Sequence, residues 1–240
     1  MNHRNLMIAA IALAALSVLL LATVVAWQRN TTYPVEGRIV VLDPGHFESR
    51  ADTGAVNLIG GVRLLERDVN WEVALATRRI LIEQGIIVVL TRQEGEYVSR
   101  PARYRIAGES RGEVLVSIHH NGADDQRINY TSTFYTHESD IAIARRAQTQ
   151  LARALGFQDG GIRPETFGMT VHSTMPAALT EAWFITHDGT ATRYLAERAA
   201  RASDAPGLGW PADSLVELEA RALSAAITDF LQATRPPGDS

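Results

Sequence analysis

Two histidines and two glutamates are placed along the chain where they could build a metal site. His46 ends the stretch VLDPGH, Glu66 lies within LLERDVN, His119 lies within VSIHHN, and Glu181 interrupts the apolar stretch PAALTEAWF. Zinc accepts imidazole nitrogen and carboxylate oxygen, and a catalytic zinc site has three protein ligands and an open fourth position for water. Burying an ionised glutamate in an apolar strand costs free energy or raises its pKa. Glu181 placed near such a metal site would therefore suit a general base.

Each of these residues alone also has a structural interpretation. Pro44 and Gly45 are strand-ending residues, so His46 could be the first solvated residue after a strand. The helix macrodipole favours a carboxylate such as Glu66 in a first helical turn, and His119 could simply end a strand. The spacing is too long for the HExxH arrangement, in which one helix supplies both histidines. The rest of the chain must therefore decide between a ligand set and unrelated structural residues.

The other histidines are weaker candidates. His120 follows His119 on an expected strand and points to the opposite side, so we expect it at the surface or behind a ligand. His3 precedes a long apolar segment and is excluded. The histidines that remain as spare ligands are His137, His172 and His187.

Apolar runs and helical spacing alternate along the chain from Arg38 onward. The runs predict buried strands at 38–43, 86–92, 113–120 and 177–186, a wetter alternating strand at 128–137, and helices at 64–85, 100–110, 139–156 and 211–234. Gly85 is expected as a left-handed helix end, Gly156 as the end of the helix at 139–156, and Ser139 as its cap. This order predicts an α/β fold, a single layered domain with a largely parallel sheet flanked by helices. Ligands in such sheets lie outside the carboxyl ends of the strands, where His46, His119 and Glu181 fall.

The first thirty residues differ from the rest of the chain. Residues 6–27 carry no charge and are long enough to cross a membrane as a helix, so residues 1–30 are expected to be an N-terminal membrane anchor. A cleaved signal peptide is the alternative, although only a poor cleavage site lies near Ala26. Residues 31–37 read as a linker, 38–234 as the catalytic domain and 235–240 as a tail. A periplasmic or extracellular domain of the cell envelope, anchored in the inner membrane, is therefore expected.

Composition excludes several classes of function. The 240 residues include no cysteine, which excludes thiolate zinc sites, cysteine nucleophiles and disulfides. Two of the 23 basic residues and none of the 27 acidic ones precede residue 31, so the remainder carries 21 basic and 27 acidic residues. An acidic domain without a basic run is not expected to bind nucleic acid.

Taken together and in this order, VLDPGH with DTGA, LLERDVN, LTR, VSIHHN and PAALTEAWF resemble the zinc-dependent N-acetylmuramoyl-L-alanine amidases of bacterial cell walls. The similarity runs from about Arg38 to about Leu231. It implies a twisted sheet with surrounding helices, and one Zn²⁺ bound through His46, Glu66 and His119. It also implies that Glu181 is the catalytic glutamate. The implied reaction is hydrolysis of the amide between N-acetylmuramic acid and L-alanine of the peptidoglycan stem peptide, in cell-wall remodelling or cell separation.

Four further residues are candidates for supporting or substrate-binding roles. Asn70 and Asn121 could orient the ligating histidines, which need partners that fix their tautomer. Arg92 and Arg103 match arginines in the family's motifs, and either contact substrate or form ion pairs that close the fold.

The chain departs from the family pattern at several positions. Phe47 and Glu48 stand where Gly-Gly is usual, Trp183 replaces a glycine, and His187 replaces an asparagine. The segment 197–214 is longer than expected and has no assigned role. No inserted autoinhibitory helix is expected between Asn121 and Glu181.

Two other functions remain open at this point. One is a catalytically inactive, peptidoglycan-binding regulator of the same fold on a membrane anchor. The other is a zinc peptidase that acts within the stem peptide. The expected partners are peptidoglycan, the membrane through residues 6–27, and an activator protein that the sequence does not identify.

Overall fold

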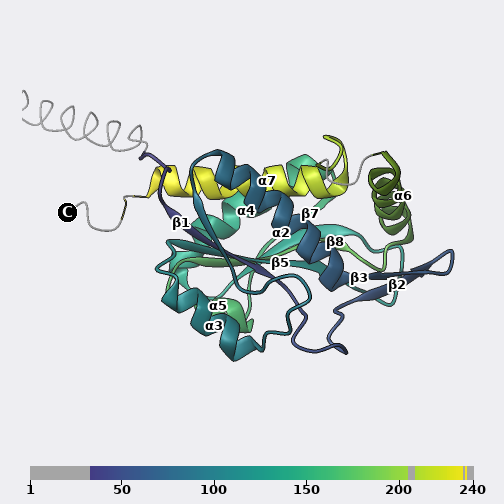
Figure 1. The fold of residues 1–240 in the computed structure, drawn as a ribbon, viewed down its shortest axis with the longest axis horizontal. Coiled ribbons are helices and arrows are strands. Elements are labelled where there is room, and N and C mark those ends of the chain that lie inside the picture. The colour runs from purple at the N-terminus through teal and green to yellow at the C-terminus, as the bar shows by residue number, and fades with distance from the viewer. Residues whose placement is uncertain (1–32, 205–208, 235, 237–240) are drawn as a thin grey trace, which may run out of the picture.

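The computed structural model describes residues 33–204, 209–234 and 236 (Figure 1). The expected membrane segment at 6–27 lies outside these residues, as does most of the tail. Within the described part of the chain, no helix combines the length and apolar character needed to cross a membrane.

One six-stranded sheet forms the centre of the molecule, in the strand order β4-β1-β5-β8-β6-β7. Its strands are β1 (Ile39–Pro44), β4 (Ile87–Leu90), β5 (Val114–Asn121), β6 (Tyr130–Tyr135), β7 (Gln158–Pro164) and β8 (Ala177–Phe184). The first four strands in this spatial order are parallel, β6 is antiparallel to β8, and β7 is parallel to β6. The prediction of an α/β fold with a largely parallel sheet is confirmed.

Helices cover both faces of the sheet (Figure 1). On one face lie α2 (Glu66–Glu83), α4 (Ile141–Leu155) and α7 (Leu215–Ala233), and on the other lie α3 (Arg100–Glu109) and the short α5 (Gly168–Val171). The larger core, on the α2 side, includes Val40, Leu42, Val116 and Ile118. The smaller core, on the α3 side, includes Val41, Leu115, Met169 and Met175.

Strand alternation places three polar residues of the central strands, Asp43, Ser117 and His119, on the α3 side of the sheet. Asp43 shares the side of Val41, and Ser117 and His119 share the side of Leu115. The Ser117 hydroxyl donates to Asp43 Oδ2 over 2.7 Å, and His119 is in register with Glu181 on β8. The fold therefore gathers these side chains at one end of the sheet.

Several elements differ from the prediction. Residues 56–65 form a hairpin, β2 (Val56–Ile59) and β3 (Val62–Leu65), so α2 begins at Glu66 and not at Leu64. The prediction also missed β7, α5 and α6 (Asp188–Asp204), the last of which accounts for the first part of the unassigned 197–214 segment.

The expected glycines at the C-terminal ends of two helices are confirmed, whereas the expected serine cap at the N-terminal end of α4 is wrong. Gly85 has the expected left-handed conformation, with φ of 81°. Gly156 ends α4 as expected and is also left-handed, with φ of 70°. Ser139 is not the cap before α4. A short 3₁₀ turn, Glu138–Asp140, precedes α4, and Asp140 stands at the N-cap without a side-chain bond to the helix. Its carboxylate accepts the backbone N–H groups of Thr136 and His137 before the turn.

Candidate metal centre

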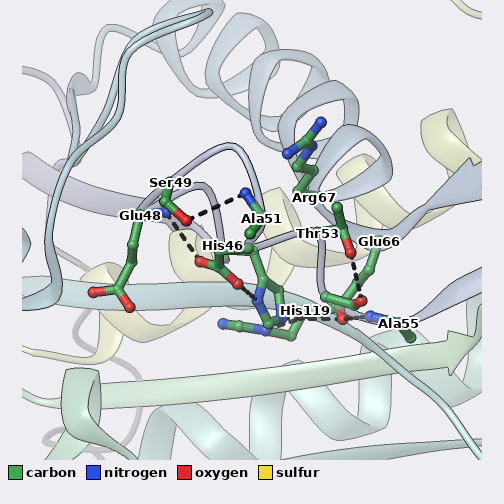
Figure 2. A network of polar contacts seen from close by, with 12 residues as sticks. His46, Glu48, Ser49, Ala51, Thr53, Ala55, Glu66, Arg67 and His119 are labelled. Atoms are coloured by element: carbon green, nitrogen blue, oxygen red, sulfur yellow. Dashed lines mark hydrogen bonds and ion pairs between the residues drawn. The ribbon is translucent and has the colours of Figure 1, made fainter.

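The side chains of His46, Glu66 and His119 meet where β1 and β5 end and α2 begins (Figure 2). Their potential ligand atoms all lie within 4.8 Å of one another. His46 Nε2 is 3.0 Å from Glu66 Oε2, and His119 Nδ1 is 3.0 Å from Glu66 Oε1. The structure therefore brings together the three residues that the sequence selected as ligands.

Two glycines allow this close approach. A Cβ atom at Gly45 would lie 2.3 Å from the His119 ring, and one at Gly54 would lie 2.3 Å from Glu66 Oε2. Gly54 also has a φ of 66°, which disfavours any side chain. The loop of residues 46–55 can therefore fold tightly over the three side chains, as Figure 2 shows.

Glu66 is buried and held in its ionised form. Its Oε2 accepts the backbone N–H of Ala55 over 2.8 Å, and its Oε1 accepts the Asn70 amide over 3.3 Å. Burial alone would raise the pKa of Glu66, but hydrogen bonds and charge from His119 and His46 lower that pKa well below its usual value. The residue thus presents the carboxylate that a metal ion requires.

Asp52 orients the His46 ring and is a functional candidate that the sequence reasoning missed. His46 Nδ1 lies 2.8 Å from Asp52 Oδ1, which leaves Nε2 facing Glu66. Asp52 Oδ2 accepts the backbone N–H of Glu48. Burial lowers the pKa of His46, but Glu66 and Asp52 outweigh it and raise the pKa overall. The DTGA motif that begins at Asp52 was the available signal, because ligating histidines commonly bond a carboxylate through their second nitrogen.

Replacing Asp52 with asparagine is expected to lower zinc affinity by about 10–100-fold, the usual cost of losing a carboxylate behind a ligating histidine. Competition with a chromophoric chelator measures the effect. Asp125→Asn is the matched control, since Asp125 is exposed and pairs only with the nearby Arg127 in the described structure. Equal zinc affinity in Asp52→Asn and the wild type would show that Asp52 does not orient His46.

The four supporting candidates differ in how they contact the site. The Asn70 amide donates a hydrogen bond to the Glu66 carboxylate. The Asn121 side chain instead accepts the backbone N–H of the next residue, Gly122. Arg92 and Arg103 both donate to the carbonyl of Pro44, over 3.0 and 2.8 Å. Both arginines are buried. Arg103 pairs with Asp43 and also lines the cavity beside His46, whereas Arg92 is not among the residues that line it.

Phe47 shows why glycine is usual at its position. Its φ of 76° lies in the left-handed region, where a side chain costs about 1–2 kcal/mol. The ring stacks on Tyr97 at 4.7 Å between centroids, and the guanidinium groups of Arg67 and Arg92 lie 4.8 and 5.2 Å from its centroid. These contacts offset the strain and fix the loop beside His46.

Phe47→Gly is therefore expected to change the free energy of unfolding by no more than about 1 kcal/mol, because relief of the left-handed strain and loss of the ring contacts oppose each other. Denaturant titration measures it. Tyr97→Ala, which removes a stacking partner and leaves the strain, should destabilise the protein. A stabilised Tyr97→Ala variant would contradict this account.

A cavity of about 400 Å³ opens beside the three side chains. Its walls include Asp43, Glu181, the Glu48–Arg100 ion pair, and Phe167 and Met169 from the α5 region, which lies between Asn121 and Glu181. Oε2 of Glu181 is buried and has no hydrogen-bond partner among the described residues. Burial, together with the charges of Glu66 and Glu219, raises the pKa of Glu181 well above its usual value. Glu181 is thus suited to accept a proton.

The remaining histidines do not join the site. His46, Glu66 and His119 are the one group among the described residues that could hold a metal ion. His172 packs against Tyr104, and His187 bonds Thr190. His120 is buried, so of its two expected positions, at the surface or behind a ligand, the structure has the second. It lies behind Glu66 because strand alternation turns it into the larger core.

Two imidazole nitrogens and one buried carboxylate, beside a glutamate of raised pKa at the carboxyl ends of parallel strands, are typical of a metal-dependent hydrolase. Residues 40–205 match the family model described as N-acetylmuramoyl-L-alanine amidase, and the chain belongs to this family. The resemblance seen in the sequence motifs is confirmed.

Individual relatives agree with this assignment. The chain is 32% identical over 164 residues to the N-acetylmuramoyl-L-alanine amidase LytC of Bacillus subtilis, covering 67% of this chain but only 32% of LytC. It is 33% identical over 176 residues to the germination-specific N-acetylmuramoyl-L-alanine amidase of Bacillus subtilis, covering 66% of this chain and 72% of that protein. The solved structure of the amidase AmiC2 of Nostoc punctiforme is 29% identical, with a TM-score of 0.68 over 82% of this chain and 99% of that chain. The chain thus spans about a third of the length of LytC and nearly all of the AmiC2 structure.

Proposed function

We propose that this protein hydrolyses the amide that joins the lactyl group of N-acetylmuramic acid to L-alanine of the peptidoglycan stem peptide. The observation that carries the proposal is the meeting of His46, Glu66 and His119, with both histidines lining the same cavity as Glu181. Membership of the amidase family supports the choice of bond.

The three clustered residues fit a zinc ion, because two neutral imidazoles and a carboxylate are a usual ligand set for a catalytic site. His46, Glu66 and His119 would hold it. Zinc bound there would supply Lewis acidity, which polarises a carbonyl and lowers the pKa of water from 15.7 to about 7.

Glu181 carries the proton transfers in the proposed reaction. Its carboxylate takes a proton from the attacking water as the water oxygen bonds to the lactyl carbonyl carbon. It then gives that proton to the alanine nitrogen as the carbon–nitrogen bond breaks, which yields a free carboxylic acid and a free amine. A raised pKa suits both steps, since a group with a pKa nearer neutrality exchanges protons more readily at neutral pH.

The location and domain limits are part of the same proposal. Residues 38–234 form the catalytic domain, and residues 1–30 hold it at the inner membrane so that it faces the periplasm or the exterior. A chain with an apolar N-terminal segment and an acidic remainder supports this arrangement. Peptidoglycan is then the partner within reach.

The test is the identity of the products. Purified, zinc-loaded protein is incubated with peptidoglycan, and the fragments are separated by mass. The proposal expects intact stem peptides with a free L-alanine amine, and glycan with free lactyl carboxylates. Fragments cut within the peptide would favour a zinc peptidase. Binding of peptidoglycan without any cleavage would favour the inactive regulator.

A further inference from the structure

A chain of buried polar side chains runs from Glu66 away from the cavity to helix α7. The Asn70 amide lies 3.3 Å from Glu66 Oε1, and Asn70 Oδ1 lies 2.7 Å from His120 Nδ1. His120 Nε2 lies 3.0 Å from Glu219 Oε2. The chain therefore links the expected metal ligand to a helix on the far side of the larger core.

The hydrogen-bond directions between Glu66, Asn70 and His120 Nδ1 are fixed by chemistry. Asn70 Nδ2 faces the carbonyl of Gly45 and the Glu66 carboxylate, which can only accept, so Nδ2 must be the NH₂ group. Asn70 Oδ1 then faces His120, and His120 Nδ1 must carry a hydrogen that it donates. Glu219 meets the other ring nitrogen. It keeps the ring in the orientation that presents this hydrogen to Asn70.

The surroundings make this arrangement costly for stability alone. Asn70, His120 and Glu219 are all at most 1% exposed, and the Trp183 ring packs edge-on against His120 at 4.7 Å. One oxygen of Glu219 has no partner among the described residues. Apolar side chains at the same positions would commonly serve a core as well or better.

We infer that His120 and Glu219 are positioning residues for the metal ligand Glu66, an inference that rests on the proposed zinc-dependent function. They hold the Asn70 amide against Glu66 Oε1. His120 adds its own backbone N–H to the same oxygen over 3.2 Å. Glu66 is thereby kept between the two ligating histidines, and α7 becomes part of the support of the site.

Two substitutions at Glu219 separate positioning from bulk structure. Glu219→Leu removes the partner of His120 Nε2 and is expected to weaken zinc binding by about 10–100-fold in the full-length chain. Glu219→Gln is expected to bind zinc within about 3-fold of the wild type, because its amide can donate to Nε2 and preserve the hydrogen on Nδ1. Chelator competition without substrate measures both affinities. Glu217→Leu is the matched control, since Glu217 is buried on the same helix but pairs with Arg79 and Arg221.

Wild-type zinc affinity in Glu219→Leu would overturn the inference. A loss of zinc affinity in Glu219→Gln or in Glu217→Leu as large as that in Glu219→Leu would overturn it too. Nitrogen NMR of His120 in the wild-type protein gives a test that needs no variant, and a ring without a hydrogen on Nδ1 would also overturn it. A wild-type protein that binds zinc tightly but releases no peptide from glycan would defeat the proposed function and leave this inference standing. A wild-type protein that binds no zinc would defeat both.

Discussion

Replacing Glu181 with glutamine is expected to lower kcat for amide hydrolysis by about 10²–10⁴-fold, the usual contribution of a general acid–base residue. Glutamine keeps the size of the side chain but cannot accept the proton of the attacking water. Zinc content should stay unchanged, because Glu181 is not one of the three clustered ligands. Release of stem peptide from purified wall fragments measures the rate, and Glu138→Gln, an exposed change, serves as the control.

The same substitution should make the metal-free protein more stable at neutral pH. Burial and the charges of Glu66 and Glu219 raise the pKa of Glu181 above 4.5, so ionising it costs more in the folded than in the unfolded chain. Stability is therefore full below the ordinary pKa and falls as pH rises through the raised one. Glutamine removes that loss, and thermal unfolding at pH 5 and pH 7 should show the gain growing with pH. Full activity in Glu181→Gln would show that another group moves the proton.

The sequence predicted the parallel part of the sheet well, because strands covered on both faces are continuous apolar runs. The stretches at 86–92 and 177–186 contain the observed strands, and those at 38–43 and 113–120 contain all but the last residue of theirs. The direction of β6 is set by contact with β8, which no local pattern encodes. β7 contains Gly160 and Gly161 and has little β propensity, so it forms because β6 offers a free edge. The hairpin at 56–65 did carry a signal, two glycines between short apolar stretches, that was not used.

The candidate site was predictable where a residue ends a strand or interrupts an apolar run. His46, His119 and Glu181 fulfil that condition, and Glu66 follows from the family motif. Asp52 and Glu219 were missed for different reasons. Asp52 belongs to a loop whose folded path depends on Gly54. Glu219 lies 99 residues from His120 on a helix whose apolar stripe gave no hint of a buried partner. Only the three-dimensional structure brings such distant residues together.

Gly45→Ala is expected to lower zinc affinity by more than about 100-fold, since displacing a ligand should exceed the effect of losing a supporting contact. The new Cβ would lie 2.3 Å from Cε1 and Nε2 of the His119 ring and 2.6 Å from Nδ1, so the ring must leave its position beside Glu66. Amidase activity should fall with zinc content. Overpacking at this site should also destabilise the protein by about 1–3 kcal/mol.

Gly108→Ala is the matched control for this prediction. Gly108 lies in helix α3, and a Cβ atom there meets nothing within 4 Å. Alanine at such a position should stabilise the protein by about 0.5–1 kcal/mol and leave zinc binding unchanged. Chelator competition and denaturant unfolding on both variants separate the effect of the Gly45 contact from a general effect of alanine. Wild-type zinc affinity in Gly45→Ala would show that the His119 ring can move away without loss of the metal. His119 would then not be a zinc ligand.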